Sequence, residues 1–312
     1  MEEIIEKIDR ALIKEELKKA TFIRRTRKCN NEIYVIEAAE SPNIMNEIGR
    51  LREIAFRNGG GGTGKAVDID EFDTMEPPCR QLFVWDPEAE EILGGYRFLL
   101  GEDIKFEANG APRIAMSHLF EFSQEFIEKY LPYTIELGRS FVALEYQSSK
   151  AGAKGLFALD NLWDGLGGIV SIYPQTKYLL GKFTMYTDFP VVGRNMIMNF
   201  LRIYFPDTDN LIWAHKPLDT TANDSDFEGL FCKTDYKKDY LTLNGEIRAL
   251  GANIPPLVSA YMALSPTMKT FGTAINDEFG DVEETGMMIT IGDIYPEKKT
   301  RHIESFSIEE VR

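Results

Sequence analysis

Acidic and arginine side chains recur in three short segments of the chain, beside glycines and near the ends of expected strands. The segments are Asp68-Ile-Asp70-Glu-Phe-Asp73, Gly94-Gly95-Tyr-Arg97 and Glu136-Leu-Gly-Arg139. Charged residues usually lie at the surface and pair weakly. A set that recurs at strand ends can instead hold a polar substrate and take up a proton. The same residues could also form a structural network of ion pairs, and the sequence leaves both interpretations open.

The composition indicates a folded protein with a sizeable core. The chain has 312 residues, 44% of them hydrophobic, and a formal net charge of −15. This length fits one large domain or two modest ones. The negative charge argues against nucleic acid as a partner, because the basic residues gather only in short clusters at 24–28 and 150–154.

Cysteine and histidine are sparse. Cys29, Cys79 and Cys232 have neither a disulfide framework nor zinc spacing, so free thiols in a reducing compartment are expected. The three histidines are isolated, and no metal site is expected. The sequence shows no signal peptide and no apolar run near the ~20 residues of a spanning helix. We expect a cytoplasmic protein, and peripheral contact with the inner membrane stays open.

Hydrophobic periodicity predicts helices interleaved with strands. The helices are expected at 3–19, 42–57, 117–130, 157–172, 191–204, 239–250 and 255–264, and the strands at 32–38, 81–86, 91–100, 134–144, 178–186, 211–214 and 286–294. The tail beyond 296 is expected to fray. Hairpins beside strand–helix–strand units predict an α/β (α+β) fold with a mixed sheet flanked by helices.

The ends of the chain differ in texture from its middle. Residues 3–19 form an amphipathic pattern that would pack on the main body or, as an alternative, contact a membrane or partner. We expect an N-terminal helix and basic segment over 1–30, a core over 31–215, and a C-terminal helical and strand extension over 216–312, packed on the core.

A glycine-rich loop lies between the second expected helix and the acidic segment. Residues 59–66 read Gly-Gly-Gly-Gly-Thr-Gly-Lys-Ala and nearly match the phosphate-binding loop of nucleotide hydrolases. The last position has no hydroxyl for magnesium, and a helix rather than a strand precedes the loop, so we reject that function. Consecutive glycines are costly to order. A flexible loop is expected, either closing over a substrate or serving only as a connector.

The ordered set of motifs resembles the acyl-homoserine-lactone synthases and the acyl-carrier-protein-dependent N-acyltransferases that make ornithine and glycine lipids, both within the GNAT acetyltransferase superfamily. The matching positions are Arg52 and Phe56 on an early helix, Asp70 and Asp73 after a loop, Arg97 after two glycines, and Glu136 with Arg139 on a later strand. Leu162-Trp163 and Ile254-Pro255-Pro256-Leu257 are similar to the lipid-forming branch. The resemblance implies a GNAT-like, largely antiparallel central sheet with a C-terminal extension, and an acyltransferase core over 31–215.

The chain departs from the lactone synthases, which favours simple amide formation. It is much longer and carries Asp68 where they usually have glutamate. Amide synthesis from a thioester needs a neutral amine, so a carboxylate must accept a proton, directly or through water. Glu136 is the first candidate for this base. Arg139 and Arg97 could hold the carboxylate of an amino-acid acceptor or brace the acids, and the resemblance gives Arg52 and Phe56 as substrate-binding residues.

The acyl donor is expected near the start of the helix that follows Arg139. Acetyltransferases hold the pantetheine or pyrophosphate of the donor there, with backbone N–H groups and the helix N-terminus. The donor-binding candidates are Lys150, Gly152, Lys154 and Gly155. The usual Arg/Gln-x-x-Gly-x-Gly/Ala pattern is not cleanly present, which favours a carrier-protein donor over coenzyme A. Carrier proteins are acidic, and the clusters at 24–28 and 150–154 are the plausible docking charges.

These observations lead to one interpretation and two rivals. The expected enzyme moves a fatty acyl group from the phosphopantetheine thioester of acyl carrier protein to the α-amine of a small amino acid, glycine or ornithine, in aminolipid synthesis. No bound cofactor or metal is expected. The rivals are an acetyl- or acyl-coenzyme A-dependent N-acetyltransferase and a non-catalytic acyl-lipid-binding protein of the kind labelled haemolysin-like.

Overall fold

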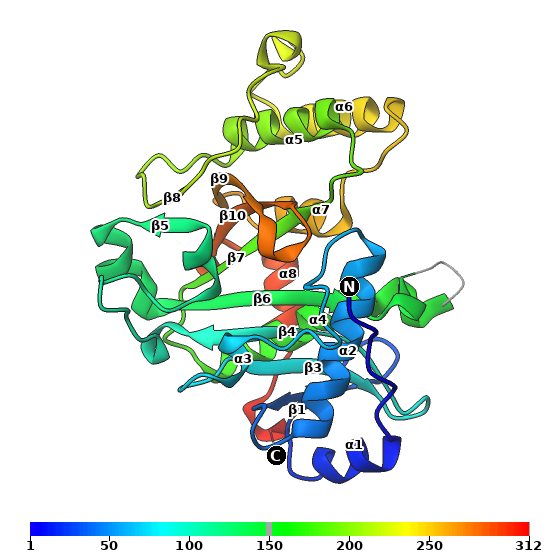
Figure 1. Cartoon of the computed structure of the whole chain (residues 1–312). Helices are drawn as coiled ribbons and strands as arrows, with labels where there is room; N and C mark the ends of the chain where they lie inside the picture. Colours follow the sequence, from blue (N-terminus) through cyan, green and yellow to red (C-terminus); the bar gives the residue numbers. More distant parts are fainter. Residues whose placement is uncertain (148–151, 312) are drawn as a thin grey trace. The chain divides into compact units, whose positions relative to one another are not determined.

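The computed structural model describes residues 1–147 and 152–311, with only the backbone for 152–156 (Figure 1). The chain forms two compact units. The first unit comprises Met1–Lys105, Pro132–Lys177 and Tyr295–Arg312, and the second comprises Phe106–Leu131 and Tyr178–Ile294. The expected division into 1–30, 31–215 and 216–312 stays a prediction.

The first unit contains an antiparallel sheet in the order β1-β2-β3-β4-β6. Its strands are β1 (Thr21–Arg25), β2 (Glu32–Ile36), β3 (Arg80–Asp86), β4 (Glu91–Leu100) and β6 (Thr134–Val142). Its helices are α1 (Arg10–Leu17), α2 (Pro42–Asn58), α3 (Glu71–Thr74), α4 (Gly152–Ile172) and α8 (Pro296–His302). Figure 1 shows β3, β4 and β6 side by side, the arrangement on which the candidate site is built.

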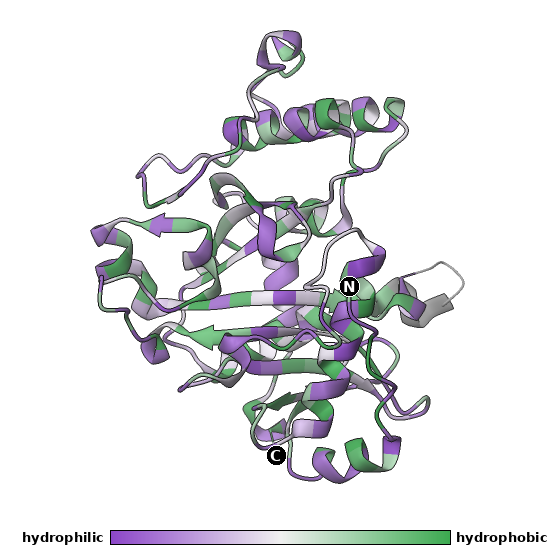
Figure 2. Cartoon of the chain, in the orientation of Figure 1, coloured by the Kyte–Doolittle hydropathy of each residue, from purple (hydrophilic) through white to green (hydrophobic). Residues whose placement is uncertain are grey.

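Helices cover both faces of this sheet. Successive residues of a strand point to opposite faces. On β3, Leu82 packs against Gly165 of α4, whereas the neighbouring Gln81 bonds to Arg52 of α2. The α4 face is apolar, and the α2 face carries polar side chains inside the core. Figure 2 shows hydrophilic segments interrupting the hydrophobic strands of this sheet.

The second unit contains a smaller antiparallel sheet in which β10 (Val282–Thr290) lies between β7 (Tyr178–Met185) and β9 (Lys269–Asn276). A separate two-stranded sheet pairs β5 (Phe120–Phe122) with β8 (Ile212–Ala214). The helices of this unit are α5 (Val191–Tyr204), α6 (Tyr236–Ala249) and α7 (Pro256–Met262). Phe200 of α5 is wholly buried among the rings of Tyr204, Phe231 and Tyr236.

The predicted fold class is confirmed: antiparallel sheets are flanked by helices. The expected hairpin forms as β3 and β4, and the expected helices at 42–57 and 191–204 form as α2 and α5. None of the helices that the structure describes combines the length and apolar character needed to cross a bilayer.

The expected helix at 3–19 is wrong in its first half. The helix starts at Arg10, with the Asp9 carboxylate capping it at Ala11 N–H, 2.7 Å away. The preceding residues are not helical and run along the end of the glycine-rich loop. Glu2 N–H donates to Gly64 O at 2.7 Å, and Ile5 N–H donates to Ala66 O at 3.1 Å.

Two further expectations are corrected, and two strands were missed. Residues 117–130 form β5 and the short π-helix Phe126–Tyr130 rather than one helix, because Phe120 to Phe122 pair with β8. The tail beyond 296, which was expected to fray, forms α8 over Pro296–His302 and a 3-10 turn over Ile308–Glu310. Strands β1 and β9 were not predicted, because their polar residues weaken the hydrophobic alternation that is typical of a strand. They become strands through pairing with neighbouring strands.

The glycine-rich loop is folded around an internal anion. The wholly buried Glu53 carboxylate of α2 accepts hydrogen bonds from the backbone N–H groups of Thr63 and Gly64, at 3.1 and 2.7 Å. It also forms an ion pair with Arg57 at 2.7 Å. Gly62 and Gly64 adopt positive φ, which lets the backbone turn its N–H groups toward that carboxylate. The loop therefore does cradle a negative group, as a phosphate-binding loop would, but the group belongs to the chain itself.

Candidate active site

The acidic segment forms a tight turn with its carboxylates turned inward. Asp70 is the N-cap of α3: its carboxylate accepts from Phe72 N–H at 3.0 Å. The Asp73 carboxylate returns to Asp70 N–H at 3.1 Å, which completes a capping box. This reciprocal pairing explains the spacing of three between the two aspartates. It also fixes the position of one carboxylate relative to the other.

The inner end of the site is wholly buried. Arg52, on α2, lies with Nη1 3.4 Å from both Asp73 carboxylate oxygens, and its Nη2 donates to the Gln81 amide oxygen. Gln81 Nε2 donates to Asp73 Oδ1 at 2.9 Å. All three side chains have an exposed fraction of 0%. They can support the site from inside, because none of their surface is open to solvent.

Arg97 connects this buried inner end to Asp70, which lies at the partly exposed outer end of the site. Its Nη1 lies 2.5 Å from Asp70 Oδ1 and 3.4 Å from Asp73 Oδ2. The guanidinium stacks over the Phe72 ring, 5.3 Å from the centroid. A side chain at Gly138 would begin 3.3 Å from Arg97 Nε, so the glycine provides the room in which the arginine lies.

Arg139 reaches the same cluster because β6 is irregular there. Alternation along a regular strand would place Gly138 and Arg139 on opposite faces. The register instead shifts between Gly95 and Arg97 of β4, so β6 carries an extra residue, and Arg139 has φ 49°. Such a bulge re-aims a side chain. Arg139 Nε lies 3.0 Å from Asp68 Oδ2, and Nη2 lies 3.2 Å from Asp70 Oδ2.

Three arginines and three aspartates thus form one network of balanced charge. Its members are Arg52, Arg97, Arg139, Asp68, Asp70 and Asp73. Asp70 and Arg139 form the outer end, with side-chain exposures of 21% and 17%, while the other members are 0 to 4% exposed. A substrate could therefore reach the outer end, and the inner end acts through it.

Burial and charge shift the acids in opposite directions. Burial alone would raise the pKa of Asp70, but the Arg97 and Arg139 guanidiniums outweigh it and hold this pKa well below its usual range. Burial raises the pKa of Asp68 despite the neighbouring Arg139. Burial would lower the pKa of Arg97, but Asp73 and Asp70 outweigh it and raise this pKa well above its ordinary value.

Glu136 lies on the network face of the sheet. It pairs with Leu99 of β4, two residues from the Arg97–Gly138 pair, so strand alternation places its side chain on the same face as Arg97. The residue is 4% exposed. Burial raises the pKa of the Cys79 thiol to about 12, and Glu136 adds to this shift while Arg97 opposes it.

Comparison with known proteins identifies the family. A model described as "Acetyltransferase (GNAT) domain" matches residues 51–155, which span the whole network. A protein of Phocaeicola vulgatus named glycine N(alpha)-acyltransferase is 59% identical over 306 residues, which cover 98% of this chain and 94% of that protein. A protein of the same name from Bacteroides thetaiotaomicron is 58% identical, over 98% and 91% of the two chains. The chain belongs to this family of N-acyltransferases. No solved structure matches the chain.

The predicted site residues of this acyltransferase are brought together to different degrees. Asp70, Asp73, Arg97 and Arg139 share direct contacts, and Glu136 lies on the same face of the sheet. Phe56, also on α2, is 8% exposed, and Arg52 is wholly buried. The substrate-binding role expected for both residues stays a prediction. Gln81 was not predicted from the sequence as a member of the site. Its one signal in the sequence is that a polar residue stands within an expected strand of mostly apolar residues.

The donor-binding residues fall largely outside what the structure describes. Lys150 lies outside the described residues, and so does the side chain of Lys154. The backbone of Gly152, Lys154 and Gly155 forms the first turn of α4, which starts at Gly152 rather than at 157 as expected. Their role in donor binding stays a prediction.

The basic cluster at 24–28 is partly committed to internal contacts. Arg24 is 3% exposed, and its guanidinium donates to the carbonyls of His302 and Ser305. Arg25 pairs with Glu32 at 2.6 Å. The prediction that Arg24 is a docking charge is therefore wrong. Arg25, Arg27 and Lys28 are exposed, and Arg27 Nη1 also donates to the Arg301 carbonyl at 3.0 Å.

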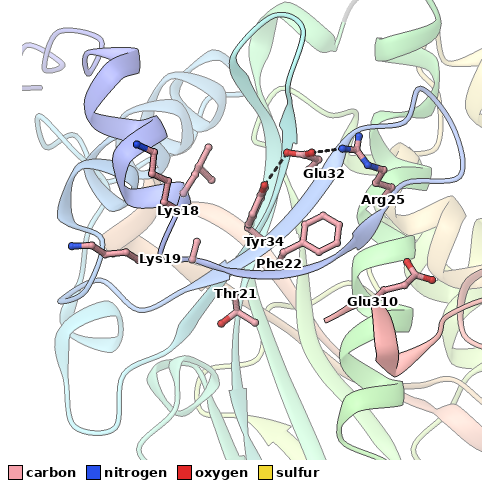
Figure 3. A pocket seen from close by; sticks show the side chains of 10 residues that line it. Lys18, Lys19, Thr21, Phe22, Arg25, Glu32, Tyr34 and Glu310 are labelled. Carbon is pink, nitrogen blue, oxygen red and sulfur yellow. Dashed lines mark hydrogen bonds and ion pairs between the residues drawn. The ribbon is translucent and has the colours of Figure 1, made fainter. Parts of the chain in front are cut away.

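A pocket of about 650 Å³ lies at the edge of the first unit's sheet, and none of its lining residues belongs to the network. Figure 3 shows the rings of Phe22 and Tyr34 beside Lys18, Lys19 and the Arg25–Glu32 pair. Among the described residues, no group of three His, Cys, Asp or Glu side chains could hold a metal ion. The chemistry therefore points to the network rather than to this hollow.

Proposed function

We propose that this N-acyltransferase moves a fatty acyl group from the phosphopantetheine thioester of acyl carrier protein to the α-amine of glycine, in aminolipid synthesis. The observation that carries the proposal is the match along 98% of the chain to two proteins named glycine N(alpha)-acyltransferase. The arginine–aspartate network beside Glu136 supplies a setting for the reaction.

The charge balance of the network favours a small acceptor. All three aspartates are already engaged by arginines, so a second ammonium group, as in ornithine, would have to displace one of those contacts. Glycine brings one carboxylate and one ammonium and needs no further acid. Arg139, the partly exposed arginine, is the residue that we expect to attract the acceptor's carboxylate.

The chemical step needs one base. Glu136 takes a proton from the glycine ammonium, directly or through water, and frees the lone pair on nitrogen. The amine attacks the thioester carbonyl, the C–N bond forms, and the C–S bond breaks. The pantetheine sulfur leaves as a thiolate and is protonated, while nitrogen gives up its remaining extra proton.

The donor is proposed from the sequence around α4. The pattern that usually holds coenzyme A is not cleanly present there, and a carrier protein brings its own docking surface. The exposed Arg27 and Lys28 remain as charges that could meet an acidic carrier, and Lys28 Nζ lies 5.5 Å from the centroid of the Phe157 ring on α4.

One assay tests donor and acceptor together. Purified protein is incubated with long-chain acyl carrier protein and either glycine or ornithine, and N-acyl products are measured by mass spectrometry. N-acylglycine from the carrier-protein donor is expected. Product from acetyl-coenzyme A alone would overturn the donor, and N-acylornithine in place of N-acylglycine would overturn the acceptor.

A further inference from the structure

We propose that Gln81 is a positioning residue of the acyl-transfer reaction: it fixes the acidic turn, and through it Asp70 and Arg139, in their working geometry. The inference rests on the function proposed above. Gln81 lies on β3 directly opposite Arg97 of β4, with an exposed fraction of 0%. It cannot touch a substrate, so any effect on the reaction must pass through its neighbours.

The amide of Gln81 is held in one orientation. Its oxygen accepts from Arg52 Nη2, and its nitrogen donates to Asp73 Oδ1 at 2.9 Å and to the Cys79 carbonyl at 3.0 Å. A rotated amide would place its N–H groups against the guanidinium and its oxygen against the carboxylate. Gln81 is therefore the neutral link between a buried cation and a buried anion.

This link is tighter than the ion pair it supports. Arg52 Nη1 lies 3.4 Å from each Asp73 oxygen, whereas the Gln81 amide lies 2.9 Å from one of them. Arg97 is also 3.4 Å from Asp73. The shortest side-chain contact that the structure gives Asp73 is thus the one from Gln81.

The contact is passed on to the outer end of the network. Asp73 Oδ2 accepts from Asp70 N–H at 3.1 Å and so closes the turn. The Asp70 carboxylate then divides between Arg97, at 2.5 Å, and Arg139, at 3.2 Å. A change at Gln81 moves Asp73, the turn and finally the partly exposed Arg139.

The substitution Gln81→Glu tests this with almost no change of shape. The introduced carboxylate would still face Arg52, but its other oxygen would meet Asp73 at hydrogen-bond distance. The other titratable groups of the cluster are Arg97 of β4, Asp68, Asp70 and the Cys79 thiol, and Ile36 of β2 brings no charge. Two carboxylates at this distance share a proton, which raises one of their pKa values. The protonated pair restores a donor toward Asp73.

The expected result is a defect that disappears on acidification. At pH 8, kcat/KM for glycine with a long-chain acyl carrier protein is expected to fall by about tenfold relative to wild type, mainly through KM for glycine. At pH 6 the ratio is expected to return to within about threefold. Gln175→Glu is the matched control, because the Gln175 amide also donates to a carboxylate, Glu102 at 3.3 Å, but on the surface.

A second variant keeps the proposal testable if Gln81→Glu does not fold at pH 8. Combining Asp73→Asn with Gln81→Glu keeps one carboxylate and one amide in contact, so its activity ratio to wild type is expected to be independent of pH. A constant ratio for Gln81→Glu, or a pH-dependent ratio for the double variant, would overturn the role of Gln81. Wild type that makes no N-acylglycine would instead overturn the proposed function, and the inference with it.

Discussion

The two ends of the arginine–aspartate network use the same residue types under different conditions. At the inner end Arg52 and Asp73 have no exposed surface, and at the outer end Arg139 and Asp70 are exposed by 17% and 21%. An ion pair that loses one partner inside a protein leaves a costly buried charge, whereas solvent can replace a partner at the surface. Residues of one motif can therefore divide into those that hold the structure and those that are open to a substrate.

The largest effect is expected at the inner end. Arg52→Met would leave Asp73 without one of its two arginines, and should lower the free energy of unfolding by about 3–5 kcal/mol. Arg25→Met is the control, because it removes an exposed ion pair with Glu32 and should cost less than about 1 kcal/mol. Urea unfolding of both variants measures the difference. Equal losses would show that the inner end has no special structural role.

The second largest effect is expected at Glu136, the proposed base. Glu136→Gln removes the proton acceptor but keeps the shape of the side chain, so kcat should fall by about 100-fold or more. The melting temperature should stay close to that of wild type. Glu40→Gln, an exposed glutamate before α2, serves as the control. A Glu136→Gln variant that melts earlier but keeps its rate would assign the residue to the structure.

The same substitution at both ends sharpens the comparison. A lysine cannot bridge two carboxylates as a guanidinium does. Arg139→Lys should raise KM for glycine by about tenfold while costing about 1 kcal/mol or less of stability. Arg52→Lys should show the reverse, with a lower free energy of unfolding and little change in the KM of the folded fraction. Kinetics and urea unfolding on both proteins separate the two effects, and parallel losses would contradict the division.

Much of the site's order could be predicted from the sequence, but its geometry could not. The segments around Arg97 and Glu136 stand on two strands that were expected, because local propensity and periodicity agree there. The helix start at Asp70 was not expected. Arg139 is different: strand alternation puts it on the opposite face from Gly138, and only the bulge turns it toward Asp70. A bulge depends on pairing between strands, which one segment alone does not encode.

Polar residues inside the core were the other source of error. Gln81 and Arg24 look like surface residues by type, yet Gln81 joins Arg52 to Asp73, and Arg24 bonds the chain near α8. Buried polar groups are defined by partners that come from distant parts of the sequence. The tail from 296 was likewise expected to fray because its partners, including Asp164 of α4 for His302, could not be seen locally.

The smallest effect should distinguish two aspartates that share Arg139. The pKa of Asp70 is lowered in the folded state, so its contribution to stability is present above its ordinary pKa and is lost as pH falls. The pKa of Asp68 is raised by burial, so its contribution is present at acidic pH and is lost as pH rises. Asp70→Asn should therefore destabilise the protein more at pH 7 than at pH 4. Asp68→Asn should show the opposite trend or none, in urea unfolding at both pH values. The same trend for both variants would mean that the two acids, which share Arg139, are not separated by their difference in exposure.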